Sequence, residues 1–370
     1  MAGSGFGMQG HDIVVIGFSA GGIEPLLRLV ADLPSDLPAA LFVVHHFPAH
    51  SISALPSILA RAAKLPVRTA RDRERVVPGH IYVGRPDRHL LLMPGLIRLT
   101  RGPREHGNRP ALDPLFRSAA RSYGGRVIGV ILSGTLDDGT VGLHAVKSAG
   151  GLAVVQDPEQ AAYPGMPKSA VDHVAVDHVA PASELGKLLN RLIREPAPPA
   201  PALVPNDLDP ELDPDQPEPA VVGTAALRRA TLPGIPSTLT CPECGGLLFE
   251  EDEAGLLHFR CHVGHAFSED TLAAVQTHAL EGALWAAVRA LEEKAELGRR
   301  LAERAHARGW QNSAARFEHA ARNAEEGSSM IRDTLLNGPV RQALETSAEQ
   351  EEPEAERRVA ASRFTGPRAQ

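Results

Sequence analysis

The sequence predicts a doubly wound α/β fold with a mostly parallel sheet, followed by a small zinc-binding module and long α-helices. Within residues 11–195, short aliphatic runs alternate with longer amphipathic stretches, which is typical of layered α/β domains. The first run, Ile13–Ile16, is apolar at every position, as expected of a strand buried on both faces. Hydrophobic residues make up 43% of the 370 residues but aromatic residues only 4%, so we expect an aliphatic core.

The alternating runs also predict the individual elements. The expected strands are Ile13–Ile16, Ala40–Val44, Val67–Thr69, His80–Val83, Ile97–Leu99, Val127–Leu132, Ala153–Val155 and Val174–Val176. The expected helices are Gly22–Leu33, Ser51–Ala63, Leu112–Tyr123, Gly139–Ala149, Met166–Asp172 and Pro181–Ile193. The pieces between residues 71 and 101 are short, and we expect them to be able to pair antiparallel at one edge of the sheet.

Changes in composition divide the chain into parts. Residues 196–219 contain nine prolines together with acidic residues, which is typical of an extended linker. Residues 271–340 have apolar residues at helical spacing and predict two long helices, broken near Arg308-Gly309. The expected parts are a flexible tail (1–10), the α/β domain (11–195), the linker (196–237), a Cys/His module (238–270), a helical hairpin (271–340) and a disordered tail (341–370).

Charge and cysteine usage exclude several classes of protein. The net charge of −7 and the pI of about 6.1 argue against nucleic-acid binding and against an anionic membrane surface. No secretory signal opens the chain, and no apolar run reaches the ~18 residues of a membrane span. All three cysteines lie between residues 241 and 261, which favours a metal site in a reducing compartment over disulfides. We therefore expect a cytoplasmic protein that is not inserted into a membrane.

A Gly-x-Ser-x-Gly turn follows the first predicted strand and places Ser19 before a helix. Such a turn can expose a serine hydroxyl at the sheet edge, next to the free N–H groups of a helix N-terminus. A nucleophile whose reaction develops an oxyanion needs this environment. Two other interpretations compete: a structural turn with an incidental serine, and a dinucleotide-binding turn. The latter expects an acidic residue after the second strand, where this chain has His45-His46.

A serine nucleophile needs a base, and the base needs an acid that orients it. Because the carboxyl ends of parallel strands meet at one edge, either His45 or His46 can reach Ser19. The turn after Val127–Leu132 carries Asp137-Asp138, which is also compatible with an ordinary Asp-Gly turn. The chain order Ser, His, Asp differs from the Ser, Asp, His order of α/β-hydrolases, and so disfavours an ordinary esterase or lipase fold.

The Cys/His module has the spacing of a structural zinc site. Cys241 and Cys244 form a Cys-x2-Cys knuckle, and Cys261-x3-His265 follows after sixteen intervening residues. We expect these four side chains to be the ligands, with His262 or His258 as substitutes for His265. The alternative is three unligated cysteines, although so short a segment could hardly fold without a metal. We expect no metal or cofactor in the catalysis itself.

At this point the motifs resemble one family, the chemotaxis protein-glutamate methylesterases (CheB family), over residues 13–193. The matching pieces occur in family order: Ile16–Gly22, His45–Pro48, Pro86–His89, Arg109-Pro110 with Asp113, Gly129–Gly134, Asp138-Gly139 and Gly165–Pro167. The resemblance implies hydrolysis of glutamyl methyl esters on the cytoplasmic helices of chemoreceptor-like proteins, often with deamidation of glutamines. It assigns the nucleophile to Ser19, the base to His46 and the acid to Asp138. Backbone N–H groups of Ala20 and Thr135 are the expected oxyanion donors.

The chain departs from the family pattern at three places. Ala20 stands where the family has Thr, and Thr135-Leu136-Asp137-Asp138-Gly139 replaces the family's Met-Gly-Asn-Asp-Gly. About twelve residues precede the first strand, so we expect no receiver domain of the kind that the best-known members carry. The second carboxylate and the lost glycine favour an alternative hypothesis, a weak or inactive adaptor. Such an adaptor would bind signalling partners through the zinc module and the C-terminal helices.

Overall fold

The computed structural model describes residues 10–46, 53–198, 234–253 and 255–337. The predicted tails and most of the predicted linker lie outside these residues. The chain divides into two compact units, Met1–Leu272 and Ala273–Gln370. The Cys/His module therefore belongs to the same compact unit as the α/β domain.

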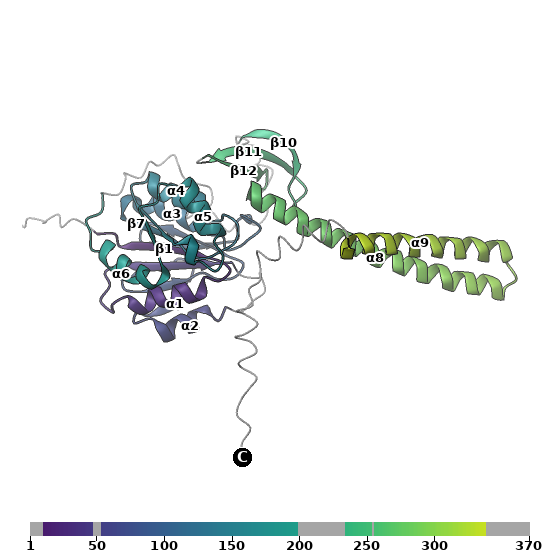
Figure 1. The fold of residues 1–370 in the computed structure, drawn as a ribbon, viewed down its shortest axis with the longest axis horizontal. Helices are drawn as coiled ribbons and strands as arrows, with labels where there is room; N and C mark the ends of the chain where they lie inside the picture. Colours follow the sequence, from purple (N-terminus) through teal and green to yellow (C-terminus); the bar gives the residue numbers. More distant parts are fainter. Residues whose placement is uncertain (1–9, 47–52, 199–233, 254, 338–370) are drawn as a thin grey trace, which may run out of the picture. The chain divides into compact units, whose positions relative to one another are not determined.

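A seven-stranded parallel sheet forms the centre of the α/β domain (Figure 1). Its order is β3-β4-β2-β1-β7-β8-β9, with β1 between β2 and β7. The strands are β1 (Ile13–Phe18), β2 (Ala40–His45), β3 (Val67–Thr69), β4 (Ile81–Val83), β7 (Val127–Ile131), β8 (Leu152–Gln156) and β9 (His178–Ala180). All six residues of β1 are buried, because helices cover both faces of the sheet. The predicted α/β fold with a mostly parallel sheet is confirmed.

Two helical layers enclose the sheet (Figure 1). The helices are α1 (Ile23–Asp32), α2 (Leu55–Ala62), α3 (Leu112–Tyr123), α4 (Thr140–Ser148), α5 (Gly165–His173) and α6 (Ala182–Leu192), with 3₁₀ turns at Gly124–Arg126 and Pro158–Gln160. The first layer, α1, α2 and α6, shares an apolar cluster with one face of the sheet. The second layer, α3 to α5, shares another apolar cluster with the opposite face. The core is therefore double, and it fixes each strand from both sides.

Most element bounds agree with the sequence predictions, but one strand is wrong and one was missed. The segments 67–69 and 112–123 match residue for residue. The predicted strand Val174–Val176 is instead part of the loop that follows α5, and the last strand is β9. That edge strand has a weak apolar signal, since Val179 is 49% exposed. The missed strand is β5 (His89–Met93), which forms an antiparallel hairpin with β6 (Leu96–Thr100) in a sheet of its own.

The Cys/His module is a four-stranded antiparallel sheet in the order β10-β11-β12-β13. Its strands are β10 (Ile235–Thr240), β11 (Leu247–Glu253), β12 (Leu256–Cys261) and β13 (Ala266–Ser268). The structure therefore begins this module a few residues before the predicted boundary at 238. The module buries few large apolar side chains, namely Leu248, Phe249, Phe259 and Phe267.

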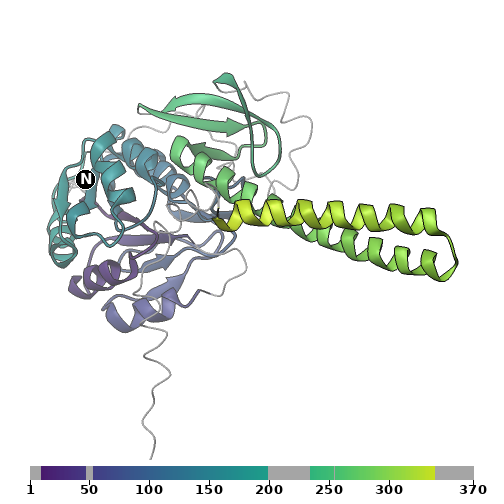
Figure 2. The same ribbon diagram turned by 45° about the vertical axis from the view of Figure 1, so that its right-hand side comes forward.

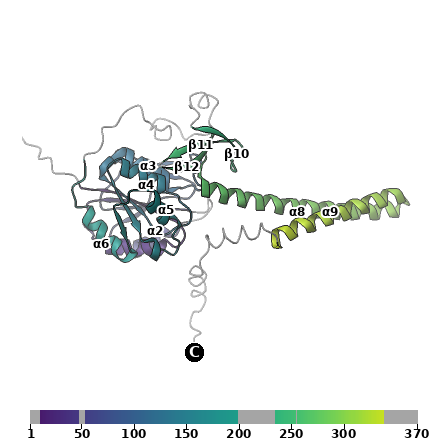
Figure 3. The same ribbon diagram turned by 45° about the horizontal axis from the view of Figure 1, so that its top comes forward.

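The second unit holds most of α8 (Glu269–Ala307) and all of α9 (Gln311–Asn337), which run side by side as a hairpin (Figures 2 and 3). The break between them falls at 308–310, where Gly309 has a left-handed φ of 74°. Small residues form the seam, for example Ala295 and Ala302, so the two helix axes can approach closely. No helix in the described residues is both long enough and apolar enough to cross a membrane.

Candidate active site and metal cluster

The candidate active site lies at the carboxyl edge of the three central strands. Ser19 directly follows β1, His46 directly follows β2, and Asp138 lies in the turn between β7 and α4. The register pairs Phe18 with His45 and Gly17 with Ile131, so these strand ends stand level. The chain extends to one side of β1 for β2 to β4 and returns to the other side for β7. This makes the edge above β1 a topological switch point, where α/β sheets build their sites.

Three predicted residues form a hydrogen-bonded series at this edge. The Nδ1 atom of His46 lies 3.0 Å from the Oγ atom of Ser19. The Nε2 atom of His46 lies 2.7 Å from the Oδ2 atom of Asp138. The His46 side chain is 17% exposed and Asp138 only 2%, so the series runs from the protein surface into a buried carboxylate. Nδ1 is thus the ring nitrogen that faces the serine.

Asp138 is fixed by the N-terminus of α3 as well as by His46. Its Oδ2 atom accepts the Leu112 N–H at 2.9 Å, and its Oδ1 atom accepts the Asp113 N–H at 3.2 Å. Burial disfavours its charge, but the positive charge of His106 and the hydrogen bond from His46 outweigh it. Together they hold the pKa of Asp138 well below its usual range. The carboxylate is therefore ionised and immobile beside the imidazole.

A second histidine, His106, lies behind the acid and was not found from the sequence. It is 4% exposed, its Nε2 atom donates to Asp113 Oδ2 at 2.9 Å, and it lies 3.8 Å from Asp138 Oδ1. Burial alone would lower its pKa. The charges of Asp138, Asp113 and Asp137 and the hydrogen bond to Asp113 instead raise the pKa of His106 to about 10. No local motif marks this loop histidine, so only the tertiary contacts identify it.

The structure distinguishes between the two adjacent histidines, of which the family resemblance assigns His46 as the base. His45 still belongs to β2, and its ring stacks on Phe18 at a centroid distance of 4.9 Å. Burial, and after it the charge of His46, lower the pKa of His45 to about 3. His45 is therefore a neutral ring beneath the site, while His46 is the one that reaches Ser19.

The turn after β1 is built for close approach. Gly21 has a φ of 70°, and a Cβ atom there would lie 2.8 Å from Ala162 and 2.9 Å from Ser133. The Ser133 hydroxyl donates to the Ala20 carbonyl at 2.8 Å and holds the turn from below. Within the described part of the chain, the backbone N–H groups of Ala20 and Thr135 have no acceptor. Both predicted oxyanion donors are thus available.

The acid turn, residues 135–139, differs from the simple Asp-Gly turn considered for this segment. Leu136 has a φ of 58°, a left-handed conformation that is uncommon for a residue with a branched side chain. Asp137 is 7% exposed, and among the described residues it forms no hydrogen bond or ion pair with His46. Its Oδ1 atom instead accepts hydrogen bonds from Ser268, at the end of the Cys/His module, and from Thr271, in the first turn of α8. The second carboxylate therefore acts as a contact point for another part of the chain.

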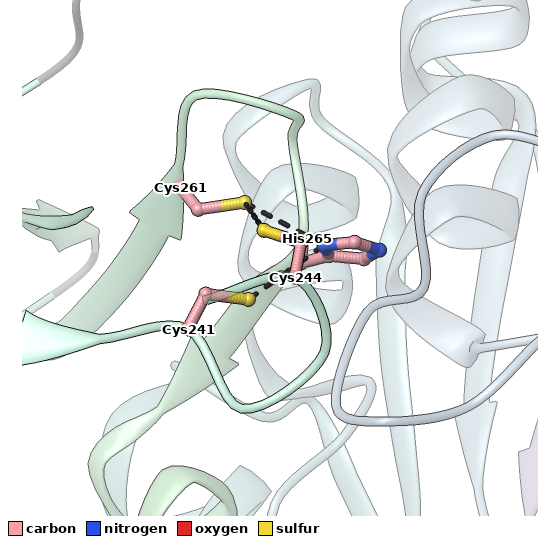
Figure 4. A group of neighbouring side chains, drawn as sticks. All are labelled: Cys241, Cys244, Cys261 and His265. Atoms are coloured by element: carbon pink, nitrogen blue, oxygen red, sulfur yellow. Dashed lines mark hydrogen bonds between the residues drawn. The ribbon is translucent and has the colours of Figure 1, made fainter. Parts of the chain in front are cut away.

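Four of the predicted metal ligands converge in the Cys/His module (Figure 4). The three sulfur atoms and the His265 ring point toward one another. The Sγ atoms of Cys244 and Cys261 lie 3.7 Å apart, and His265 Nδ1 lies 3.6 Å from Cys241 Sγ and 3.5 Å from Cys261 Sγ. Neither substitute histidine joins this cluster in the described residues.

These distances fit a tetrahedral zinc ion. With Zn–S near 2.3 Å and Zn–N near 2.0–2.1 Å, tetrahedral ligand atoms lie about 3.8 Å apart for two sulfurs and about 3.5 Å apart for sulfur and nitrogen. Burial raises the pKa of the Cys241 thiol to about 12 and also raises that of Cys261. The metal-free cluster would therefore carry protons that a bound ion displaces.

A second group of potential ligands, Glu105, His106 and Asp113, is already engaged in ion pairs. Glu105 accepts from Arg117 at 2.6 Å, and burial of its carboxylate is outweighed by the charges of Arg117 and Arg260. The pKa of Glu105 falls to about 2. We interpret this group as part of the buried framework.

The fold and the site together define a class of protein. A parallel α/β sheet that carries a Ser–His–Asp series above its central strands has the arrangement that serine hydrolases use. Comparison with known proteins gives the particular family: the CheB methylesterase profile matches residues 14–189.

Two curated relatives support this match, and one solved structure is also similar to the chain. "Protein-glutamate methylesterase/protein-glutamine glutaminase 2" of Anaeromyxobacter dehalogenans is 40% identical over 183 residues, which cover 50% of this chain and 54% of that protein. A "putative protein-glutamate methylesterase/protein-glutamine glutaminase" of Leptospira interrogans is 36% identical, with 49% of this chain and 95% of that protein covered. The crystal structure of the Thermotoga maritima CheB methylesterase catalytic domain is 35% identical, with a TM-score of 0.48, and covers 49% of this chain and 98% of that one.

The chain belongs to the CheB methylesterase family. The resemblance deduced from the motifs is confirmed, and the match covers the α/β domain. The chain spans about half the length of several curated relatives that it matches, including the Anaeromyxobacter protein.

Proposed function

We propose that this chain is a serine hydrolase that demethylates glutamyl methyl esters on chemoreceptor-type signalling proteins, with deamidation of glutamines as a second reaction. The observation that carries the proposal is the hydrogen-bonded series of Ser19, His46 and Asp138 above the central strands. The names of the relatives support the same pair of reactions. An intact hydrogen-bonded series favours this function over the inactive adaptor.

The geometry supports a defined proton path. The Nδ1 atom of His46, 3.0 Å from the serine oxygen, takes the hydroxyl proton while that oxygen attacks the ester carbonyl. The buried Asp138 accepts the opposite N–H and stabilises the imidazolium that forms. The backbone N–H groups of Ala20 and Thr135 donate to the developing oxyanion.

The second half of the reaction uses the same groups. The imidazolium of His46 returns its proton to the leaving oxygen, and methanol departs from the acyl-enzyme. His46 then deprotonates a water molecule, which attacks the acyl-enzyme and releases a free glutamate side chain and the serine hydroxyl. A glutamine side chain would follow the same path with ammonia as the leaving group. No cofactor takes part in either reaction.

The remaining assignments concern the C-terminal part of the chain. We assign Cys241, Cys244, Cys261 and His265 to one structural zinc ion, because the four ligand atoms fit its geometry. The proposed partners are the methylated cytoplasmic helices of chemoreceptor-like proteins. Other signalling proteins would bind through the α8–α9 hairpin. The cytoplasmic location deduced from the cysteine usage stays a prediction.

Methanol release from a methylated receptor fragment tests this function. The intact chain should release methanol, and Ser19→Ala should lower the rate by at least about 1,000-fold, because the covalent step is lost. Ser183→Ala, at an exposed serine of α6, is the matched control and should match the wild type. A fluorophosphonate probe should label the wild type and Ser183→Ala but not Ser19→Ala.

The two readouts separate the ways in which the proposal can fail. Ser19 that is labelled by the probe without any methanol release would overturn the substrate class. A correctly folded chain with unlabelled Ser19 and no methanol release would overturn the esterase itself.

A further inference from the structure

The acid turn holds an unfavourable backbone conformation next to the predicted catalytic acid. Leu136 has a φ of 58°, and the next two residues are the buried Asp137 and Asp138. Such a conformation persists only where the surroundings hold it. The contacts of Asp137 therefore bear directly on the position of Asp138.

Asp137 contacts residues that lie more than a hundred positions further along the chain, at the C-terminal end of the first compact unit. Its Oδ1 atom accepts the Ser268 hydroxyl at 2.7 Å and the Thr271 hydroxyl at 3.1 Å. All three residues are at least 93% buried. A carboxylate is an acceptor only, and two hydroxyl donors on one oxygen form charge-assisted hydrogen bonds, which are the strong kind.

The two hydroxyls are themselves held in place. The Ser268 oxygen accepts the Thr271 N–H at 3.1 Å, as at a helix N-terminus, so both residues present a fixed pair at the start of α8. Just before them, Ala266 pairs with residues 104–106 through two backbone hydrogen bonds, of 2.7 and 3.3 Å. Gly264 lies so close to Pro103 that a Cβ atom there would be 2.9 Å from its ring.

A second route leads from Thr271 to the acid through His106. The Nδ1 atom of His106 lies 3.4 Å from Thr271 Oγ1, and its Nε2 atom donates to Asp113 at 2.9 Å. Thr271 thus receives a hydrogen bond from His106 and donates one to Asp137. The His258 ring meets the His106 ring edge-on at 5.7 Å. Two neighbours of Asp138, namely Asp137 and His106, are therefore both in contact with Thr271.

We propose that residues 235–272 complete the active site: Ser268 and Thr271 are positioning residues that hold Asp137, and through it the acid turn that carries Asp138. The Cys/His segment then has a defined task in the hydrolase beyond metal binding. This inference rests on the proposed esterase chemistry, because it assigns residues that position its acid.

The test measures the rate constant for labelling of Ser19 by a fluorophosphonate in the full chain, which needs no receptor substrate. The variants are Ser268→Ala/Thr271→Val, Asp137→Ala, and their combination. We expect the first two to lower the rate constant about tenfold each, since a misplaced catalytic group is costly. The combination should be only slightly slower than Asp137→Ala alone, because both hydroxyls act on the acid turn chiefly through Asp137, and only the longer contact of Thr271 with His106 is lost in addition.

Further measurements guard against a general loss of folding. Thr277→Val removes a hydroxyl of α8 whose hydrogen bond, among the described residues, goes to the Ala273 carbonyl of the same helix, and it should label like the wild type. Hydrogen exchange should speed up at residues 135–140 in the Ser268→Ala/Thr271→Val variant, while β1 stays protected. The single variant Thr271→Val, of nearly the same shape, should show the same change to a smaller degree.

Three outcomes would overturn the inference. One is a Ser268→Ala/Thr271→Val variant that labels at the wild-type rate. Another is a combination whose loss is the product of the separate losses, since the two sides would then act independently. The third is faster exchange spread evenly over the α/β domain, which would indicate general destabilisation. A wild type that is not labelled at all would instead count against the proposed function.

Discussion

The α/β domain and the Cys/His module hold their key side chains by different physical means. In the domain, two apolar clusters enclose the sheet, and Ser19 and His46 follow strands that are almost entirely buried. The module buries only a handful of large apolar side chains, and its four candidate ligands lie within 4.8 Å of one another. Packing thus positions Ser19 and His46, whereas the proposed metal ligation would position the loops of the module.

Both regions contribute contacts to the acid turn, residues 135–139. Asp138 is held on one side by the α3 N-terminus, an element of the well-packed domain. On the other side its neighbour Asp137 accepts hydrogen bonds from Ser268 of the weakly packed module and from Thr271 at the start of α8. Ser19, His46 and Asp138 are therefore held by different contacts. Each kind of contact can be removed separately by mutation.

Removal of the metal ligands should give the largest effect. A structural zinc ion contributes on the order of 10 kcal/mol in small modules, so His265→Ala should lose zinc and unfold the module. The expected zinc content is one ion per wild-type chain. Proteolysis should become fast within residues 241–265, while β1 and β2 stay protected by the double core.

His262→Ala is the matched control, because it removes a histidine of the same module that does not join the four ligand atoms. This variant should keep its zinc and its protease resistance. Zinc loss in His262→Ala together with zinc retention in His265→Ala would contradict the ligand assignment.

His106→Gln should give an intermediate effect that depends on pH. Because the folded pKa of His106 is raised from 6.5 to about 10, its stabilising contribution is fully present below pH 6.5 and is lost as the pH rises through 10. Among the described residues, the groups around the ring include the carboxylates of Glu105, Asp113, Asp137 and Asp138, the Thr271 hydroxyl and the His258 ring.

The free energy of unfolding of wild type and His106→Gln, measured by urea titration, checks this prediction. The free energy of unfolding of the wild type should exceed that of His106→Gln at pH 6.5. This difference should be smaller by more than about 1.4 kcal/mol, the equivalent of one pKa unit, at pH 9. His173→Gln, at an exposed helix end, serves as the control. A gap that grows with pH would show that His106 is neutral in the folded protein.

Arg104→Ala should give the smallest effect. Arg104 pairs with Glu243 of the module at 3.3 Å, but their side chains are 34% and 25% exposed. Partly solvated ion pairs contribute about 0–1 kcal/mol. A double-mutant cycle with Glu243→Ala should therefore give a coupling energy below about 1 kcal/mol. A coupling energy above about 2 kcal/mol would contradict this prediction and would make the Arg104–Glu243 ion pair a main contact between the module and the α/β domain.

The sequence allowed much of the site to be predicted, for a local reason. Buried parallel strands are continuous apolar runs, and Ser19 and His46 directly follow two of them. The Cys-x2-Cys and Cys-x3-His spacings likewise bring four ligands onto two short turns. In each case a short stretch of sequence, either an apolar strand or a Cys/His spacing, contains or directly precedes the site residues.

What the sequence could not decide depends on contacts between distant segments. His106 lies in a loop without a motif, and the partners of Asp137 are more than a hundred residues away along the chain. Reasoning from the residues alone left His45 and His46 open as the base, and the choice of His46 came from the family resemblance, which the contact with Ser19 agrees with. The last strand was misplaced because an edge strand with an exposed Val179 lacks an apolar signal.

The sequence by itself thus determined the α/β class, the serine turn and the composition of the metal cluster, because hydrophobic periodicity and ligand spacing are local properties. The tertiary structure alone decided that the Asp137 carboxylate accepts hydrogen bonds from Ser268 and Thr271. The physical reason is that the hydrogen bond between Asp137 and Ser268 joins two segments that are far apart along the chain. The hydrophobic pattern of each segment predicts its own secondary structure but not its contact with the other.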